Sequence, residues 1–278
     1  MSRKPRDLDE DDVRVRPGPG SRPRSRLRPT HAEATEGFVV AVDRGRFTCL
    51  VGKHEVVAVR ARELGRKAVV VGDRVGLVGD VSGRADTLAR LVRVEPRTSL
   101  LRRSADDTDP VERAIVANAD QLAIVCAVAN PEPRVRLIDR YLVAAFDGGL
   151  EPLLILTKTD LADPQSLIEN YALLDLRVVV TSHGEPGPEL RALLRDRVTV
   201  LAGPSGVGKS TLINALVPGA LRATGDVNEV TGRGRHVSTS TVVLELPGGG
   251  RVIDTPGVRS FGLAHVDVAR IVSAFPDL

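Results

Sequence analysis

The fold of this chain is decided by the stretch Gly203-Pro204-Ser205-Gly206-Val207-Gly208-Lys209-Ser210. It matches the pattern GxxxxGK[ST], follows an apolar strand predicted over 198–201, and opens a predicted helix, as this motif requires. Glycines let the backbone wrap around phosphates, so that N–H groups at the helix N-terminus point at the anion. Lys209 is expected to place a compact cation on the β and γ phosphates, and Ser210 to bind Mg²⁺. The stretch therefore predicts a nucleoside triphosphate site.

A second motif, Asp254-Thr255-Pro256-Gly257, directly follows a strand predicted over 251–253. A carboxylate at a strand end opposite a P-loop can hold Mg²⁺, and the N–H of Gly257 can meet a γ-phosphate. Alone, these four residues are typical of an ordinary turn. With a P-loop one predicted hairpin upstream (241–246 and 251–253), they indicate the nucleotide-sensing switch of a GTPase.

The third motif, Thr157-Lys158-Thr159-Asp160, follows a strand predicted over 152–156. The Asp160 carboxylate can accept from both N1–H and the 2-amino group of guanine, whereas adenine would leave the carboxylate unpaired. The usual GTPase pattern is NKxD, so Thr157 replaces Asn and brings one bracing hydrogen bond into question. Thr181 and Ser182 follow a strand predicted over 177–180, where GTPases place a loop that touches the guanine oxygen.

The order of these motifs differs from that of an ordinary GTPase, in which the P-loop comes first. Here the guanine motif at 157–160 precedes the P-loop at 203–210. We therefore predict a circularly permuted domain, in which a shift of the switch at Asp254 would pass directly to a module that follows it.

Between the P-loop and Asp254, residues 231–241 are rich in Gly, Arg, Ser and Thr and lack an apolar period, which predicts a switch loop. Thr239, with Ser238 as the alternative, is expected to complete the Mg²⁺ shell. The chain has no Gln near Asp254, which predicts slow intrinsic hydrolysis that a partner accelerates. His236 is a candidate for positioning the attacking water; the alternative is a solvated or phosphate-touching loop histidine.

These arguments define three sets of candidate site residues. The catalytic candidate is His236. The Mg²⁺ ligands are Ser210, Thr239 and Asp254. The nucleotide-binding candidates are Thr157, Lys158, Asp160, Thr181, Ser182, Gly203, Ser205, Gly206, Val207, Gly208, Lys209, Ser210, Thr211, Asp254 and Gly257.

The predicted fold is an all-β oligonucleotide-binding (OB) barrel followed by an α/β P-loop GTPase domain with a mostly parallel sheet. The predicted divisions are a disordered Arg-rich tail (1–36), the barrel (37–103), a linker (104–119), the permuted GTPase domain (120–265) and the start of a C-terminal module (266–278). The barrel rests on short predicted strands. These strands cover 37–42, 47–51, 55–59, 68–71, 74–78 and 87–94.

Composition narrows the class of protein. Hydrophobic residues make up 42% and charged residues 27% of 278 residues, which is typical of about two folded soluble domains. The longest apolar run, Leu122 to Ala129, has eight residues, against the ~20 that a membrane-spanning helix needs. Without a secretory signal, we expect the protein in the cytoplasm. Cys49 and Cys126 lie in apolar runs and are expected to be buried small hydrophobes.

Charge is unevenly distributed along the chain. The segment from Arg14 to Arg28 has six arginines and no acid, which suits an arm that binds RNA phosphates; the alternative is a solubilising tail. The barrel also carries basic residues but few aromatics, so any nucleic-acid binding there would depend on phosphates and shape; the alternative is an ordinary solvated surface.

The combination of motifs resembles the bacterial ribosome small-subunit-dependent GTPases, the RsgA or YjeQ type. The matching residues are the barrel run, TKTDL at 157–161, GPSGVGKSTLINAL at 203–216, GRGRH at 232–236 and IDTPGVRSFGL at 253–263. The resemblance implies a late-acting maturation factor that binds the 30S subunit and its 16S rRNA, and hydrolyses GTP to GDP when the subunit stimulates it. The expected cofactors are GTP or GDP and Mg²⁺. We expect a monomer, with neither a membrane nor DNA as a partner.

The family usually ends in a zinc-binding module built from Cys and His. This sequence stops at Leu278 with no Cys after Cys126, so it is interpreted as lacking that module, and no residue is assigned to zinc. We expect Zn²⁺ only if the natural chain extends beyond Leu278. Two other functions stay open: a GTP-dependent RNA- or protein-binding switch not tied to the ribosome, and a P-loop ATPase or kinase.

Overall fold

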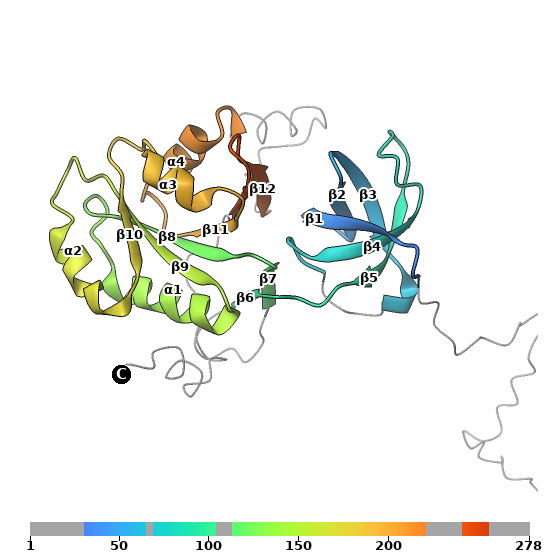
Figure 1. Ribbon diagram of the computed structural model, residues 1–278, viewed down its shortest axis with the longest axis horizontal. Coiled ribbons are helices and arrows are strands. Elements are labelled where there is room, and N and C mark those ends of the chain that lie inside the picture. Colours follow the sequence, from blue (N-terminus) through green and yellow to red (C-terminus); the bar gives the residue numbers. More distant parts are fainter. Residues whose placement is uncertain (1–30, 65–68, 104–112, 221–240, 256–278) are drawn as a thin grey trace, which may run out of the picture. The chain divides into compact units, whose positions relative to one another are not determined.

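The computed structural model describes residues 31–64, 69–103, 113–220 and 241–255. Its first folded region is a closed five-stranded barrel with the strand order β1-β2-β3-β5-β4 (Figure 1). Neighbouring strands are antiparallel except β3 and β5, which are parallel. The barrel elements are β1 (Thr35–Asp43), β2 (Arg46–Val51), β3 (His54–Arg60), the 3-10 helix η2 (Arg62–Leu64), β4 (Arg74–Gly79) and β5 (Ala89–Val94). This arrangement confirms the predicted OB-type barrel.

The barrel interior is filled by every second residue of its strands. Phe47 and Cys49 of β2 face Val56 and Ala58 of β3, and all four are buried. This alternation follows from the period of two in a strand, which points successive side chains to opposite faces. Cys49 is therefore a buried, free thiol that belongs to the core, as expected from its apolar surroundings.

The strand predicted over 68–71 is wrong. Of its residues, Ala68 lies outside the described residues, and Val71 forms only an isolated bridge with Val116. The chain turns here instead: the Asp73 N–H donates to the Val70 carbonyl oxygen at 3.2 Å, and Asp73 accepts from the Val70 N–H at 2.8 Å. The run of valines is apolar because these residues are buried, and residues can be buried in a turn as well as in a strand.

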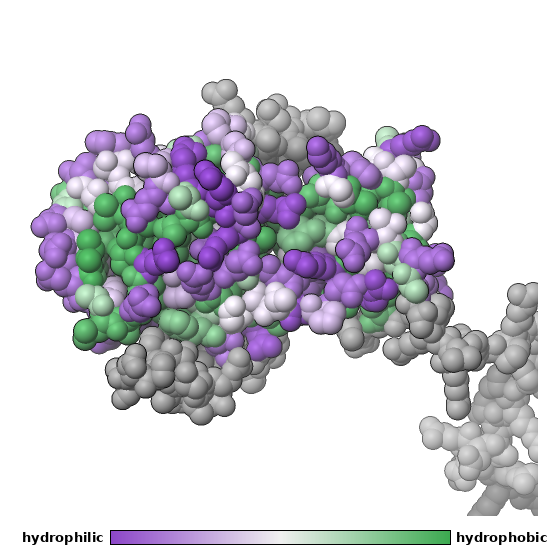
Figure 2. All heavy atoms as spheres, viewed as in Figure 1, coloured by the Kyte–Doolittle hydropathy of each residue, from purple (hydrophilic) through white to green (hydrophobic). Residues whose placement is uncertain are grey.

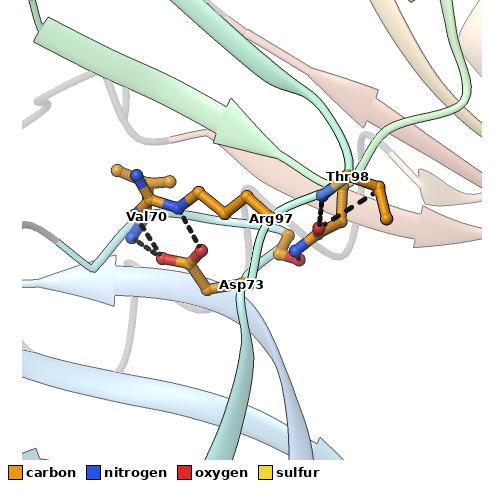
Figure 3. A network of polar contacts seen from close by, with 6 residues as sticks. Val70, Asp73, Arg97 and Thr98 are labelled. Atoms are coloured by element: carbon orange, nitrogen blue, oxygen red, sulfur yellow. Dashed lines mark hydrogen bonds and ion pairs between the residues drawn. The ribbon is translucent and has the colours of Figure 1, made fainter. Parts of the chain in front are cut away.

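A network of polar contacts holds this turn against later parts of the chain (Figure 3). The fully buried Asp73 carboxylate accepts from Nε of Arg97 at 2.7 Å and from its Nη2 at 2.9 Å. Asn118 Oδ1 accepts from the Thr98 N–H at 2.9 Å, and Asn118 Nδ2 donates to the Gly72 carbonyl oxygen at 2.9 Å. These bonds tie the turn to the segment after β5, which contains Arg97, and to Asn118, which follows β7.

Two short strands, β6 (Leu100–Arg103) and β7 (Arg113–Ala117), form an antiparallel pair in which Leu101 faces Val116. This pair has no counterpart among the strands predicted from the sequence. Each strand is only four or five residues long, and the intervening residues include charged ones and no apolar alternation, so the local sequence pattern carries little strand signal.

The second folded region is a six-stranded sheet with the order β10-β9-β8-β11-β13-β12, in which only the edge strand β12 is antiparallel to its neighbour. This topology confirms the predicted mostly parallel α/β sheet. The strands are β8 (Gln121–Ala127), β9 (Glu151–Thr157), β10 (Arg177–Val180), β11 (Val198–Ala202), β12 (Val242–Glu245) and β13 (Arg251–Asp254). The helices are α1 (Val135–Gly148), α2 (Gln165–Asn170), the 3-10 helix η3 (Ala172–Leu174), α3 (Pro188–Leu194) and α4 (Lys209–Leu216).

Helices cover both faces of this sheet (Figure 1). On β9, Leu154 and Leu156 pack in the cluster that contains the buried side of α1 and α2. The alternate residues Leu153 and Ile155 pack with α3 and α4. Strands buried on both faces read as continuous apolar runs, which is why these central strands are recognisable in the sequence.

The surface mixes polar and apolar residues. In the view of Figure 2, hydrophilic residues cover much of the described surface, with smaller apolar areas between them. Across the described residues, the longest helix, α1, has 14 residues, and none is long and apolar enough to cross a membrane.

Candidate functional site

The candidate residues gather at one edge of the six-stranded sheet. The strands β9, β10, β11 and β13 are parallel, so their carboxyl ends meet at the same edge, where α/β proteins bind ligands. The guanine motif begins at the last residue of β9, Thr181 and Ser182 follow β10, the P-loop follows β11, and Asp254 is the last residue of β13. Segments up to about 100 residues apart in sequence thus form one candidate site.

The P-loop runs from Gly203 into α4. Gly203 has φ +150°, and a Cβ there would lie 2.4 Å from the carbonyl oxygen of Val125, so the tight start of the loop requires glycine. No side chain caps the N-terminus of α4, while Ser205, Ser210 and Thr211 are exposed. The first N–H groups of a helix have no partner within the helix and favour an anion, so this end of α4 is suited to phosphate.

Lys209 and Asp254 form the charged centre of the site. The Lys209 ammonium donates to the carbonyl oxygens of Gly203 at 2.5 Å and Pro204 at 2.9 Å. Burial lowers the pKa of Lys209 and raises that of Asp254, and the opposite charge of each residue counteracts the shift of the other. Both groups are therefore desolvated next to each other, as a site for a charged ligand requires.

The donor set fits a magnesium ion that is bound together with phosphates. Asp254 Oδ1 is buried and has no hydrogen-bond partner, which leaves a carboxylate oxygen able to accept a cation or its water. Within residues 31–64, 69–103, 113–220 and 241–255, no group of three or more His, Cys, Asp or Glu could hold a metal alone. Mg²⁺ commonly binds through one or two protein groups plus phosphates and waters, so Asp254 and Ser210 suffice as protein ligands.

Thr157 lies beneath the P-loop. Its buried hydroxyl donates to the Val207 carbonyl oxygen at 2.6 Å, so Thr157 makes the brace that the absence of Asn brought into question. The neighbouring Lys158 has φ +59°, and its ammonium donates to the Asn130 carbonyl oxygen in the loop after β8.

Asp160 is exposed and held by the loop after β10. The His183 N–H donates to Asp160 Oδ1 at 3.3 Å, and this bond lowers the pKa of the Asp160 carboxyl below its usual value. Asp160 is therefore ionised at neutral pH and can accept two hydrogen bonds from a guanine edge. Thr181 is buried beside it and donates its N–H to the Leu156 carbonyl oxygen at 2.7 Å, whereas Ser182 is exposed.

Four candidates, His236, Ser238, Thr239 and Gly257, lie outside the described residues. The structure adds two residues that the motifs did not identify, His183 and Asn130. His183 follows Thr181 and Ser182 directly, so its position in the sequence could have drawn attention to it. Asn130 acts through its backbone carbonyl, which no side-chain pattern reveals.

We predict that Gly203→Ala destabilises the P-loop. The new methyl group would approach the Val125 carbonyl oxygen to 2.4 Å, and strain of this kind costs about 1–3 kcal/mol. Thermal unfolding and GDP titration should show a lower unfolding temperature and weaker binding. Gly187→Ala is the matched control, because a Cβ at Gly187 meets nothing within 4 Å. Equal behaviour of the two variants would contradict the prediction.

The fold and site together define a class of protein: a circularly permuted P-loop GTPase-type domain preceded by an OB-like barrel. A model of the RsgA GTPase family matches residues 94–264, and the chain belongs to this family.

Two curated relatives illustrate the likeness. "Small ribosomal subunit biogenesis GTPase RsgA" of Pseudomonas fluorescens is 40% identical over 216 residues, which cover 75% of this chain and 61% of the relative. "Small ribosomal subunit biogenesis GTPase RsgA 1" of Vibrio vulnificus is 38% identical over 219 residues, covering 76% and 61% respectively. The chain thus spans about three fifths of the length of these relatives.

Solved structures share the fold. YjeQ from Thermotoga maritima superposes with a TM-score of 0.60 at 28% identity, covering 84% of this chain and 77% of that one. YloQ, described as a circularly permuted GTPase, has a TM-score of 0.64 at 24% identity, with 90% and 81% covered, and supports the fold alone.

Proposed function

We propose that this protein binds GTP and GDP with Mg²⁺, hydrolyses GTP to GDP and phosphate, and acts in the maturation of the small ribosomal subunit. The observation that carries the nucleotide part is that Lys209 at the start of α4, Asp254 at the end of β13 and Asp160 after β9 lie at one edge of a parallel sheet. The names of the relatives support the ribosomal part.

In the proposed mechanism, the N–H groups of the P-loop and the Lys209 ammonium hold the β and γ phosphates. Ser210 and Asp254 hold Mg²⁺, with Thr239 completing the shell. When bound, Mg²⁺ supplies positive charge that stabilises the phosphate oxygens during transfer. Asp160 selects guanine, with the loop of Thr181 and Ser182 beside it.

His236 is proposed to position the attacking water once the protein is bound to its partner. With no Gln near Asp254, the isolated protein is expected to turn over GTP slowly. His236→Ala should remove the partner-stimulated part of the rate and leave nucleotide affinity in place. If His236→Ala keeps the full partner-stimulated rate of GTP turnover, this role of His236 is wrong.

The proposed partner is the 30S subunit, contacted through 16S rRNA by the barrel, with the Arg-rich segment before it as a second candidate. The barrel carries the cationic residues Lys53, Arg60 and Arg74, and their positive charge favours recognition of RNA phosphates. We propose that the protein acts as a cytoplasmic monomer.

The decisive experiment measures GTP turnover with and without purified 30S subunits, in parallel with binding of fluorescent GTP and ATP analogues. The proposal expects tight binding of the GTP analogue only and a large increase in turnover on adding subunits. Equal turnover rates would overturn the ribosomal role and leave a GTP-dependent switch. Preference for the ATP analogue would overturn the assignment of Asp160.

A further inference from the structure

Thr255, the residue after Asp254, is buried and uses its hydroxyl inside the sheet. It is 4% exposed, and its Oγ1 donates to the Leu201 carbonyl oxygen at 3.2 Å. Strands β11 and β13 are parallel, with Leu201 opposite Asp254, and Leu201 lies shortly before the start of the P-loop at Gly203. The hydroxyl therefore fastens the chain just past Asp254 to the strand that leads into the P-loop.

The end of β11 is a fixed reference point for this contact. Leu201 is fully buried on a strand that pairs with β8 on one side and with β13 on the other. Gly203 lies so close to β8 that a Cβ there would approach a carbonyl oxygen of that strand to 2.4 Å, and its own carbonyl oxygen accepts from the Lys209 ammonium. Asp254 is thus tied, through Thr255, to the same short segment that holds the phosphate-binding lysine.

Thr255 also contacts the Asp254 carboxylate directly. Its N–H bonds the Asp254 carboxyl and, like the charge of Lys209, counteracts the rise in the pKa of Asp254 that burial causes. Among the described residues, Asp254 Oδ1 has no hydrogen-bond partner, so it stays available to a ligand. Mg²⁺ demands near-ideal octahedral geometry, and a small displacement of this carboxylate would therefore weaken its hold on the ion.

We propose that Thr255 is a positioning residue for Mg²⁺, whose hydroxyl keeps the Asp254 carboxylate in the place where one ion is held by both the carboxylate and the nucleotide phosphates. The inference rests on the proposed binding of guanine nucleotides with Mg²⁺. Thr255 contacts neither the ion nor the nucleotide in this role and acts through Asp254.

A positioning role and a merely structural role differ in how they affect the dependence on Mg²⁺. The measured quantity is the Mg²⁺ gain, defined as the affinity for the imido analogue of GTP with Mg²⁺ divided by the affinity with EDTA. This analogue keeps the phosphates of GTP and has a nitrogen bridge that resists hydrolysis. A displaced Asp254 reduces the Mg²⁺ gain, whereas a general loss of stability lowers both affinities alike and leaves the gain unchanged.

The test replaces the hydroxyl of Thr255. Thr255→Val puts a methyl group in its place and leaves the Leu201 carbonyl oxygen without this donor, so we expect the Mg²⁺ gain to fall about tenfold. Thr255→Ser keeps the hydroxyl and should retain the gain. Thr255→Ala should lower the gain in the same direction as Thr255→Val, and it tests the inference if Thr255→Val fails to fold. In an Asp254→Asn background, Thr255→Val should change the gain little, because the hydroxyl acts through the carboxylate.

Thr199→Val is the matched control. Thr199 is fully buried on the same strand as Leu201, and its hydroxyl oxygen accepts from Gln121 Nε2 at 2.8 Å. It lies opposite Val252, near the start of β11 rather than at the carboxyl edge of the sheet. This variant should lower the unfolding temperature and leave the Mg²⁺ gain unchanged.

An unchanged Mg²⁺ gain in both Thr255→Val and Thr255→Ala would overturn the inference, and so would an equal fall of the gain in Thr199→Val. In either case, Mg²⁺-dependent binding of the analogue by the unmodified protein would still support the proposed function. If the unmodified protein fails to bind the analogue, or binds it equally well with Mg²⁺ and with EDTA, both the inference and the proposed binding of nucleotide with Mg²⁺ are wrong.

Discussion

Replacing Asp160 by asparagine should lower the affinity for GDP by about 100-fold, since it removes a charged acceptor of two hydrogen bonds from the guanine edge. The asparagine amide presents one acceptor and one donor where the carboxylate presents two acceptors. Guanine offers two donors on that edge. Xanthine offers one donor, N1–H, and a carbonyl oxygen in place of the 2-amino group, and therefore matches asparagine.

The variant should thus prefer xanthosine diphosphate (XDP) over GDP. Direct titration of both nucleotides with both proteins measures the reversal. Asp175→Asn serves as the control, because Asp175 is also exposed and its left-handed backbone, φ +47°, is one that asparagine tolerates. Retention of GDP preference by Asp160→Asn would exclude Asp160 as the residue that reads the base.

The parts of the site that the sequence predicts are those in which function constrains consecutive residues. The P-loop, the guanine motif and Asp254 each lie at the carboxyl end of a strand, and parallel strands bring such positions to one edge of the sheet. The central strands β8, β9 and β11 are equally visible, because burial on both faces makes them continuous apolar runs.

The parts that the sequence does not reveal depend on contacts between distant residues. Thr157 and Val207 are 50 positions apart, and the bond uses a backbone carbonyl that is present at every residue. The strand predicted over 68–71 fails for the same reason, because the turn there is specified by Asp73 and by its partner Arg97, 24 positions later. An apolar run in the sequence indicates that its residues are buried, but it does not show whether they are buried in a strand or in a turn.

The same turn gives the largest effect on stability that we predict. Asp73→Ala should lower the free energy of unfolding by about 3–5 kcal/mol, the usual cost of breaking a buried ion pair by removing one partner. Asp73 is fully buried, whereas the Arg97 side chain is 24% exposed, so the carboxylate contributes its charge where water cannot replace it. The change also removes the acceptor of the Val70 N–H.

Urea unfolding of the whole chain would measure this loss, with Asp80→Ala as the control. Asp80 is an exposed aspartate of the same barrel region whose Oδ1 accepts from the Ser82 N–H, so removing it should lower the free energy of unfolding far less than Asp73→Ala does. Arg97→Met in the Asp73→Ala background should cost much less than Arg97→Met alone, since contacting residues couple in a double-mutant cycle. Additive losses would mean that the two side chains stabilise the protein separately, which would contradict the predicted coupling of Asp73 and Arg97.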